Sequence, residues 1–211
     1  MPVFEQLGQC PIIPVIVIDK LDDAVPMAEA LLAGGLEALE ITLRTPAALD
    51  AIGAIAKALP DALVGAGTVI SPHQFRQVEN AGGRFAVSPC LTPSLAEAAQ
   101  AVGMPWLPGA VTATEVQRAR ELEVTDLKFF PAGTSGGPAH LKGLAAVYAD
   151  VRFCPTGGVN LANLSDYLAI PAVAAVGGSW LTPADAVAAK DWGAVTATAR
   201  ESYAAALSAR T

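Results

Sequence analysis

Short apolar segments alternate with helical patterns eight times along the chain, and this alternation is the feature that most limits the possible folds. The strands are predicted at residues 11–18, 37–43, 62–66, 84–87, 105–108, 124–130, 151–155 and 172–176. Helical patterns follow them at residues 22–32, 46–59, 71–80, 92–102, 112–121, 138–148, 161–168, from residue 182 onward and at 192–209. Eight such units predict an α/β fold, a (β/α)₈ TIM barrel. The alternative is an open doubly wound sheet.

Residues 1–9 add a predicted N-terminal helix before the first strand. No linker, low-complexity tract or repeat interrupts the 211 residues, so residues 1–211 are predicted to form a single barrel domain. The chain is shorter than a barrel of about 250 residues, which requires short loops. A hydrophobic content of 53% and a charged content of 16% suit a parallel sheet that is buried on both faces.

Charge and cysteine usage exclude several classes of partner. A net charge of −7 without a basic run argues against nucleic acid. No signal pattern or membrane-length apolar run is present, so we expect a cytoplasmic protein without a membrane partner. The three cysteines are irregularly spaced and are predicted to be reduced thiols. The two histidines lie far apart, so we expect no metal and no cofactor, although a site built from carboxylates stays open.

Lys128 is the one lysine that falls inside a predicted strand. An ammonium group loses hydration in such a segment, which lowers the pKa of a lysine and makes its amine a nucleophile toward carbonyl carbons. The alternative is a lysine at a strand end whose side chain reaches back to water. This segment alone does not decide between the two.

Strand parity places Lys128 beside other ionisable groups. In the second strand Leu39 and Ile41 share the face expected under the helices, so Glu40 and Arg44 point into the barrel or its mouth. The same parity turns Lys128 inward, toward the carboxyl ends of the strands where such barrels hold their active sites. The alternative is a purely structural ion pair between Glu40 and Arg44.

Paired glycines follow each of the last two predicted strands. They are Gly157 and Gly158 after the seventh strand, and Gly177 and Gly178, with Ser179, after the eighth. Glycine lets backbone N–H groups turn toward an anion, and barrels commonly bind phosphate at these two loops. Two ordinary tight turns are the alternative.

Together these groups predict imine chemistry. The Lys128 amine would attack a ketone to form a carbinolamine and then an iminium, and Glu40 would move the protons. Arg44 suits a substrate carboxylate, and Thr68 after the third strand offers another donor. With the glycine loops holding a phosphate, the implied substrate is a 2-oxo acid with a terminal phosphate.

Several segments resemble the class I 2-keto-3-deoxy-6-phosphogluconate (KDPG) aldolases, the KHG/KDPG aldolase family. They are PVIV at 14–17, LEITLRT at 39–45, VGAGTV at 64–69, FAVSP at 85–89, LKFFPA at 127–132, RFCPTGG at 152–158 and GGSWL at 177–181. The resemblance covers all but the N-terminal helix and the tail. It departs at Gly133, where many members have glutamate, and that affects the expected loop conformation more than the chemistry.

The resemblance implies a homotrimeric TIM barrel, a metal-independent carbon–carbon lyase of the Entner–Doudoroff pathway. Such an enzyme cleaves KDPG to pyruvate and D-glyceraldehyde 3-phosphate, and many members also use 4-hydroxy-2-oxoglutarate. By resemblance, the imine-forming lysine is Lys128 and the acid/base is Glu40. The residues implied in binding pyruvate, the substrate hydroxyls and the phosphate are Arg44, Thr68, Pro89, Phe130, Thr156, Gly157, Gly158, Gly177, Gly178 and Ser179.

Three other functions compete with this prediction. The first is an aldolase for the galactonate epimer, against which the Thr156 hydroxyl favours the gluconate substrate. The second is a phosphate-binding barrel isomerase that forms no covalent bond. The third is a non-catalytic binder of sugar phosphates, for which a lysine and a glutamate inside one barrel have little use.

Overall fold

The computed structural model describes residues 3–7 and 10–210. Its strands are β1 (Ile12–Ile16), β2 (Ala38–Thr42), β3 (Leu63–Gly67), β4 (Ala86–Val87), β5 (Trp106–Leu107), β6 (Asp126–Phe129), β7 (Arg152–Pro155) and β8 (Val176–Gly178). Its helices are α1 (Val3–Gln6), the 3₁₀ turn η1 (Leu21–Asp23), α2 (Ala24–Ala33), α3 (Ala48–Ala58), α4 (Pro72–Asn80), α5 (Pro93–Ala101), α6 (Ala113–Glu121), α7 (Gly137–Val147), α8 (Leu164–Leu168), α9 (Ala184–Ala189) and α10 (Trp192–Ser208).

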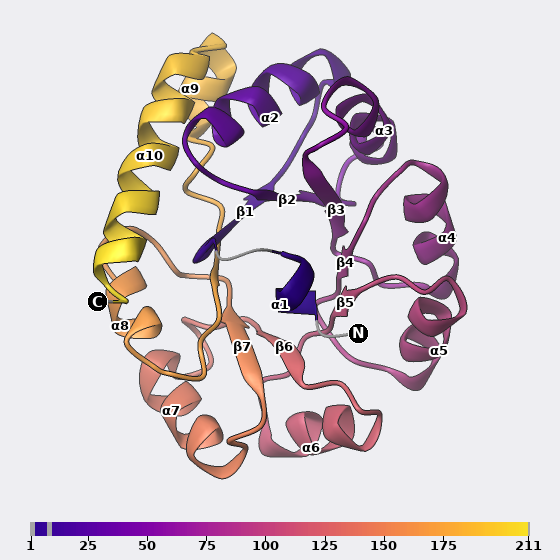
Figure 1. Cartoon of the computed structure of the whole chain (residues 1–211), viewed down its shortest axis with the longest axis vertical. Helices are drawn as coiled ribbons and strands as arrows, with labels where there is room; N and C mark the ends of the chain where they lie inside the picture. Colours follow the sequence, from indigo (N-terminus) through magenta and orange to yellow (C-terminus); the bar gives the residue numbers. More distant parts are fainter. Residues whose placement is uncertain (1–2, 8–9, 211) are drawn as a thin grey trace.

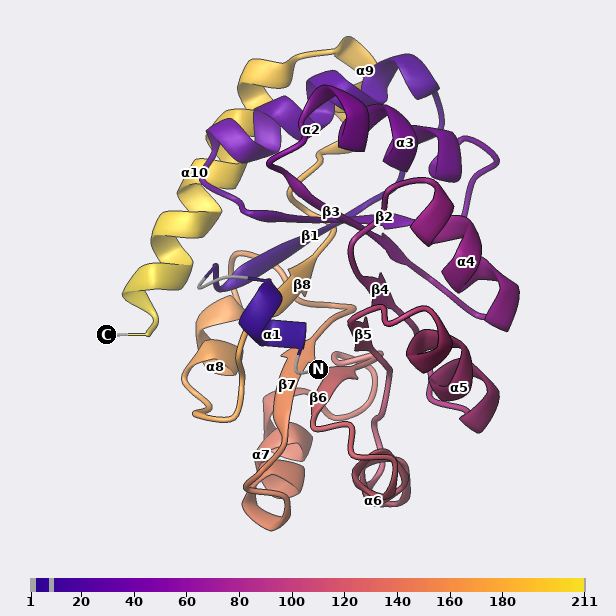
Figure 2. The ribbon, with the colours of Figure 1, turned by 45° about the vertical axis from the view of Figure 1, so that its right-hand side comes forward.

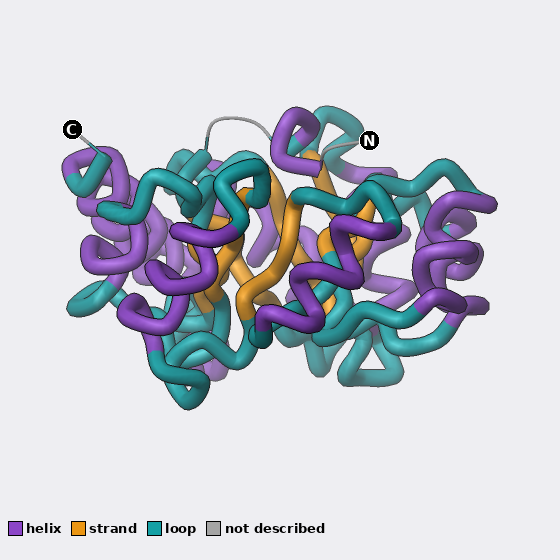
Figure 3. Tube along the Cα trace, turned by 90° about the horizontal axis from the view of Figure 1, so that it is seen from below, coloured by secondary structure: helices purple, strands orange, loops and turns teal. Residues whose placement is uncertain are grey.

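All the strand pairs are parallel and make a strongly curled sheet. One sheet has the order β5-β4-β3-β2-β1-β8, and β6 and β7 form a second pair. Isolated parallel bridges join the sheets, between Gly109 and Lys128 on one side and between Thr156 and Gly177 on the other. The helices from α2 to α10 surround the strands in Figure 1, and strands lie between helices in Figure 3. The predicted parallel α/β architecture is confirmed at this level.

The strands separate two apolar cores, as their parity predicts. Leu39 and Ile41 of β2 belong to the larger core, which packs against the surrounding helices. Ala38 of β2 instead belongs to a smaller core with Phe85 and Leu107. Side chains that alternate along a strand face opposite sides, so the smaller core is the inward one. Glu40 shares the parity of Ala38 and therefore lies on the inner side.

Helix α1 covers the inner core at the amino ends of the strands (Figure 2). Its residues Val3 and Phe4 are buried in that core. The Phe4 N–H donates to Oδ2 of Asp126 over 3.0 Å, and the Arg152 guanidinium donates to both carboxylate oxygens over 2.8 and 2.9 Å. Because Asp126 and Arg152 begin β6 and β7, this network lies at the end of the sheet opposite the predicted active site.

Two sequence predictions need correction. The N-terminal helix predicted at residues 1–9 is described as Val3–Gln6, and residues 1, 2, 8 and 9 lie outside the described part. The eighth strand, predicted at residues 172–176, is instead Val176–Gly178. Residues 172–175 run beside β7, where Val173 forms one bridge with Phe153. The pair Gly177–Gly178 was interpreted as the loop after the strand, but it forms most of the strand itself. None of the described helices is long and apolar enough to span a membrane.

Candidate active site

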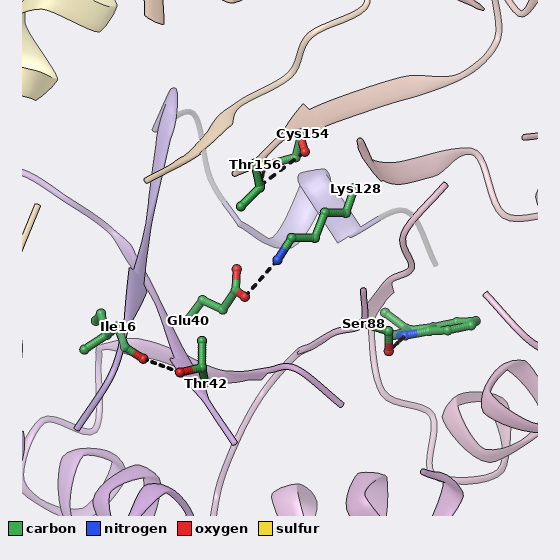
Figure 4. A network of polar contacts seen from close by, with 8 residues as sticks. Ile16, Glu40, Thr42, Ser88, Lys128, Cys154 and Thr156 are labelled. Carbon is green, nitrogen blue, oxygen red and sulfur yellow. Dashed lines mark hydrogen bonds and ion pairs between the residues drawn. The ribbon is translucent and has the colours of Figure 1, made fainter. Parts of the chain in front are cut away.

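Lys128 and Glu40 meet on the inner side of the strands (Figure 4). The Lys128 Nζ donates to Oε1 of Glu40 over 3.1 Å, although 88 residues separate them in the chain. Both side chains are buried, with 7% and 3% of their surfaces exposed. The two residues come from β6 and β2, which belong to different sheets. Strand parity therefore brings together the amine and the carboxylate that the sequence predicted.

The position of this ion pair decides between the alternatives that the sequence left open for Lys128 and for Glu40. Lys128 is buried, so its ammonium does not reach back to bulk water. Arg44 is exposed after the end of β2, and the ion pair that Glu40 makes within the described part of the chain is with Lys128. The structural Glu40–Arg44 pair is therefore wrong. Arg44 lies two residues beyond the end of β2.

Thr156 and Cys154 lie beside the ion pair at the end of β7 (Figure 4). Cys154 is the register partner of Lys128, and both are buried. The Thr156 Oγ1 donates to the Cys154 carbonyl over 3.4 Å. Burial raises the pKa of the Cys154 thiol to about 12, a shift that the nearby Lys128 ammonium reduces and the Glu40 carboxylate increases. The thiol therefore stays protonated and serves as an uncharged surface next to the amine.

Phe130 adds an aromatic face to the same place. The Lys128 Nζ lies 5.3 Å from the centroid of its ring, and Phe130 itself is half-buried. A cation at this distance from a ring face is stabilised by the ring quadrupole. Phe130 is thus placed next to the amine.

Three further predicted residues line the carboxyl ends of the strands at greater distance. Thr68 follows β3 with a positive φ of 58°, which turns the chain away from the strand. Pro89 follows β4 and is half-buried, and Arg44 follows β2 and is exposed. Among the described residues, no hydrogen bond or ion pair joins these three side chains to Lys128 or Glu40. Their exposure suits groups that meet a ligand from the solvent side.

The two glycine pairs differ in conformation. Gly157 and Gly158 have φ values of 88° and 83°, so this loop adopts the left-handed geometry that glycine favours. Gly177 and Gly178 are buried in β8, and neither has a positive φ. Ser179 is exposed at the end of β8, where it lines a cavity of about 420 Å³ together with Val15, Lys20 and Lys190.

Sequence reasoning missed two groups near the site. Strand parity alone places Cys154 inward, two residues before Thr156, and would have identified it as a neighbour of Lys128. The second is the buried Ser88, whose Oγ accepts a hydrogen bond from Trp106 Nε1 over 2.7 Å and so fixes the chain just before Pro89. No sequence pattern indicates that bond, because it joins neighbouring strands across the outer face.

A buried amine in contact with a buried carboxylate can perform imine chemistry. The amine can add to a ketone, and the carboxylate can take up and return protons over the 3.1 Å that separates them. Within residues 3–7 and 10–210, no group of three or more histidine, cysteine, aspartate or glutamate side chains could hold a metal ion.

Comparison with known proteins decides which family uses this arrangement. Residues 3–198 match the family described as KDPG and KHG aldolase. The chain belongs to this family. The KHG/KDPG aldolase of Escherichia coli is 51% identical over 191 residues, which cover 90% of both chains.

Two further relatives come from other bacteria. The 2-dehydro-3-deoxy-phosphogluconate aldolase of Dickeya dadantii is 50% identical over 196 residues, covering 93% of this chain and 92% of that one. The KDPG aldolase of Legionella pneumophila superposes with a TM-score of 0.92 at 44% identity, covering 95% and 97% of the two chains. In that structure pyruvate is captured as a covalent carbinolamine intermediate. The predicted family resemblance is confirmed.

Proposed function

We propose that this chain is a class I aldolase that cleaves 2-dehydro-3-deoxy-6-phosphogluconate to pyruvate and D-glyceraldehyde 3-phosphate. The observation that carries the proposal is the buried contact of 3.1 Å between the Lys128 amine and the Glu40 carboxylate. Membership of the family supports it, because relatives at 50% and 51% identity bear the names of this activity. The carbinolamine captured in the Legionella pneumophila enzyme supports a covalent route for this family.

The reaction begins when the uncharged Lys128 amine adds to the C2 carbonyl carbon of the substrate. The carbinolamine loses water and becomes an iminium. Glu40 then takes the proton of the C4 hydroxyl while the C3–C4 bond breaks, and the electron pair of that bond moves toward the iminium nitrogen. The aldehyde leaves and an enamine remains on Lys128. A proton from Glu40 to C3 and hydrolysis of the resulting imine release pyruvate and restore the amine.

The other predicted residues bind the two ends of the substrate in this proposal. Arg44 and Thr68 hold the carboxylate, with the Pro89 segment and Phe130 beside the pyruvate unit. Thr156 contacts the hydroxyls in the middle. Residues Gly157, Gly158, Gly177, Gly178 and Ser179 hold the phosphate, of which Gly157 and Gly158 have the backbone geometry that exposes N–H groups.

A second activity on 4-hydroxy-2-oxoglutarate follows from the same site. The Escherichia coli relative is named for both substrates, and it is 51% identical to this chain. This substrate carries a carboxylate where the sugar acid carries phosphate, so the imine chemistry is unchanged. The aldolase for the galactonate epimer remains the closest competing function.

We also propose that residues 1–211 form one closed eight-stranded barrel that assembles as a homotrimer. Bridges between Gly109 and Lys128 and between Thr156 and Gly177 support closure, because they join the two sheets at both edges. The trimer rests on the resemblance alone, and sedimentation of the purified protein tests it. The cytoplasmic location also stays a prediction from the sequence.

Steady-state cleavage tests the proposed activity. Pyruvate released from the gluconate and galactonate substrates and from 4-hydroxy-2-oxoglutarate is measured with a coupled lactate dehydrogenase assay, with and without a chelator. We expect the highest kcat/KM for the gluconate substrate and no effect of the chelator. Higher kcat/KM for the galactonate epimer would assign the competing aldolase, and no release from any of the three substrates would remove the lyase.

A further inference from the structure

Gly67, at the end of β3, leaves space that the Glu40 side chain fills. A Cβ added at Gly67 would lie 2.2 Å from Oε1 of Glu40, and 2.7 and 2.8 Å from its Cγ and Cδ. Non-bonded carbon and oxygen atoms do not approach so closely. Gly67 has no positive φ, so the residue is required here for space and not for backbone conformation.

Gly177 has the same relation to Thr156. These two residues form an isolated bridge between β7 and β8. A Cβ at Gly177 would lie 2.2 Å from the Thr156 Oγ1, 2.9 Å from its Cγ2 and 3.0 Å from its Cβ. Gly177 lacks a positive φ as well. The missing side chain therefore lets the threonine hydroxyl lie flat against β8.

Gly109 repeats the pattern beside Lys128, its bridge partner. A Cβ at Gly109 would lie 2.1 Å from the Pro89 carbonyl oxygen and 2.3 Å from the carbonyl carbon. The glycine therefore allows the Pro89 carbonyl to lie against the backbone next to Lys128.

We propose that Gly67, Gly109 and Gly177 are positioning residues, each of which leaves a notch in the wall of the active site. Glu40, the Pro89 carbonyl and the Thr156 hydroxyl fill these notches, and their places around Lys128 depend on them. The inference rests on the proposed function for the roles of these three groups. It gives Gly177 a second role, holding Thr156, beside the phosphate contact that the family resemblance implied.

The Gly67 notch directs the carboxylate that transfers protons. Glu40 is the register partner of Gly65, and Gly67 lies two residues further toward the carboxyl end of β3. The Glu40 side chain thus extends along the inner face toward the carboxyl ends of the strands. The Gly67 backbone is held by pairing with Thr42 and by the Leu43 N–H, which donates to its carbonyl over 2.8 Å. A methyl group at position 67 must therefore displace the carboxylate and not the strand.

The chain supplies a matched control in the same strand. Gly65 also faces inward, and a Cβ there would lie 2.4 Å from Cδ1 and 2.5 Å from the carbonyl oxygen of Phe85, a residue of the inner core. Gly65→Ala therefore adds the same methyl to the same face, where its three nearest atoms belong to Phe85 and not to Glu40. Gly143 in α7 has no atom within 4 Å of an added Cβ, so Gly143→Ala serves as the neutral control.

A double-mutant cycle between Gly67→Ala and Glu40→Ala tests the notch. With glutamate at position 40, Gly67→Ala should lower kcat by about 100-fold, since a displacement of roughly 1 Å has that effect, and change KM by less than about threefold. The rate of hydrogen exchange at the pyruvate methyl should fall with kcat. In the Glu40→Ala background the added methyl meets no carboxylate, so Gly67→Ala should change the remaining rate by less than about threefold.

Thermal unfolding of the same four proteins gives a readout that does not depend on the reaction. Gly67→Ala should lower the unfolding midpoint in the wild-type background and lower it less in the Glu40→Ala background, because the methyl then occupies vacated space. This coupling tests the notch even if the wild type does not cleave the substrate, whereas loss of wild-type cleavage contradicts only the proposed function.

Two results would overturn the inference. The first is a Gly67→Ala protein with wild-type kcat. The second is that Gly67→Ala lowers the rate and the unfolding midpoint equally in the wild-type and Glu40→Ala backgrounds. Should Gly67→Ala not fold, Gly177→Ala in the wild-type and Thr156→Ala backgrounds repeats the cycle at the second notch. Coupling there supports the inference, and additive effects there contradict it. The control Gly65→Ala should also lower the unfolding midpoint. Its loss of kcat should be at least about ten times smaller than that of Gly67→Ala.

Discussion

Two ion pairs with buried carboxylates lie along β6 or across from it, and their β6 residues are two positions apart on the same inner face. Asp126 pairs with Arg152 at the amino end of the strand, and Lys128 pairs with Glu40 toward the carboxyl end. Within the described residues the Asp126 carboxylate accepts three hydrogen bonds, from Phe4 N and from Arg152 Nε and Nη2. The Glu40 carboxylate accepts one, from Lys128 Nζ.

The difference separates a structural pair from a reactive one. A planar guanidinium with two bonds to a carboxylate holds its charge in a fixed place, and the bond from α1 completes the site. A single bond between an ammonium and one carboxylate oxygen leaves both groups able to exchange protons and partners. The same strand thus carries a structural pair at one end of its inner face and the proposed reacting amine at the other.

Replacing the reacting amine should have the largest effect. Lys128→Ala removes the nucleophile, so kcat for cleavage should fall by about 10⁴-fold or more in the coupled pyruvate assay. Lys142→Ala, at an exposed position in α7, is the matched control and should keep wild-type kcat. A Lys128→Ala protein with more than about a tenth of the wild-type rate would place the chemistry on another residue.

Changing the carboxylate should have a smaller effect. Glu40→Gln keeps the shape but cannot accept a proton, so cleavage and hydrogen exchange at the pyruvate methyl should both slow by about 10²- to 10⁴-fold. Proton NMR in deuterated water follows the exchange directly. Glu37→Gln, at an exposed position before β2, should leave it unchanged. Unaltered exchange in Glu40→Gln would remove this residue from proton transfer.

Breaking the pair at the other end should affect stability and not the chemical step. Arg152→Ala leaves the buried Asp126 carboxylate without its cation, so the free energy of unfolding should fall by about 3 kcal/mol in urea titrations. The exposed Arg120–Asp150 pair is the control, and Arg120→Ala should cost less than about 1 kcal/mol. A large loss of kcat in folded Arg152→Ala would mean that the two ends of β6 are not independent.

Cys154, which lies beside the Lys128–Glu40 pair, should affect stability only at high pH. Burial raises the pKa of its thiol from 9.0 to about 12, so the folded state binds its proton more tightly than the unfolded state does. The resulting stability is complete below pH 9 and is lost as the pH rises through about 12. Within that window the free energy of unfolding of wild type should fall by about 1 kcal/mol per pH unit more than that of Cys154→Ala. If the free energy of unfolding falls equally steeply with pH in wild type and in Cys154→Ala, the thiol is not held protonated.

Strand parity accounts for most of what the sequence predicted. The alternation of Leu39 and Ile41 with Glu40 was enough to place the carboxylate inside, and the same rule placed Lys128. The sequence predicted that Lys128 and Glu40 lie close together without a known distance. Both side chains were predicted to point into a small barrel, where residues on opposite strands are near each other. The strands and helices were located by the period of their apolar residues, which is a local signal.

The glycines are where sequence reasoning failed, because their role depends on packing and not on local pattern. Gly177 and Gly178 suggested a turn, since glycine is common in turns, yet they form most of β8. A notch becomes visible only when the residue that fills it is placed, and Glu40 comes from another strand. The Asp126–Arg152 pair was missed for the same reason.

Reductive trapping tests the central claim most directly. The protein is incubated with pyruvate and borohydride, digested, and its peptides are measured by mass spectrometry. An imine on Lys128 predicts one stable adduct, with the mass of reduced pyruvate, on the peptide that contains Lys128, and its loss in Lys128→Ala. No adduct, or an adduct on another lysine, would contradict the assignment of Lys128 as the imine-forming residue.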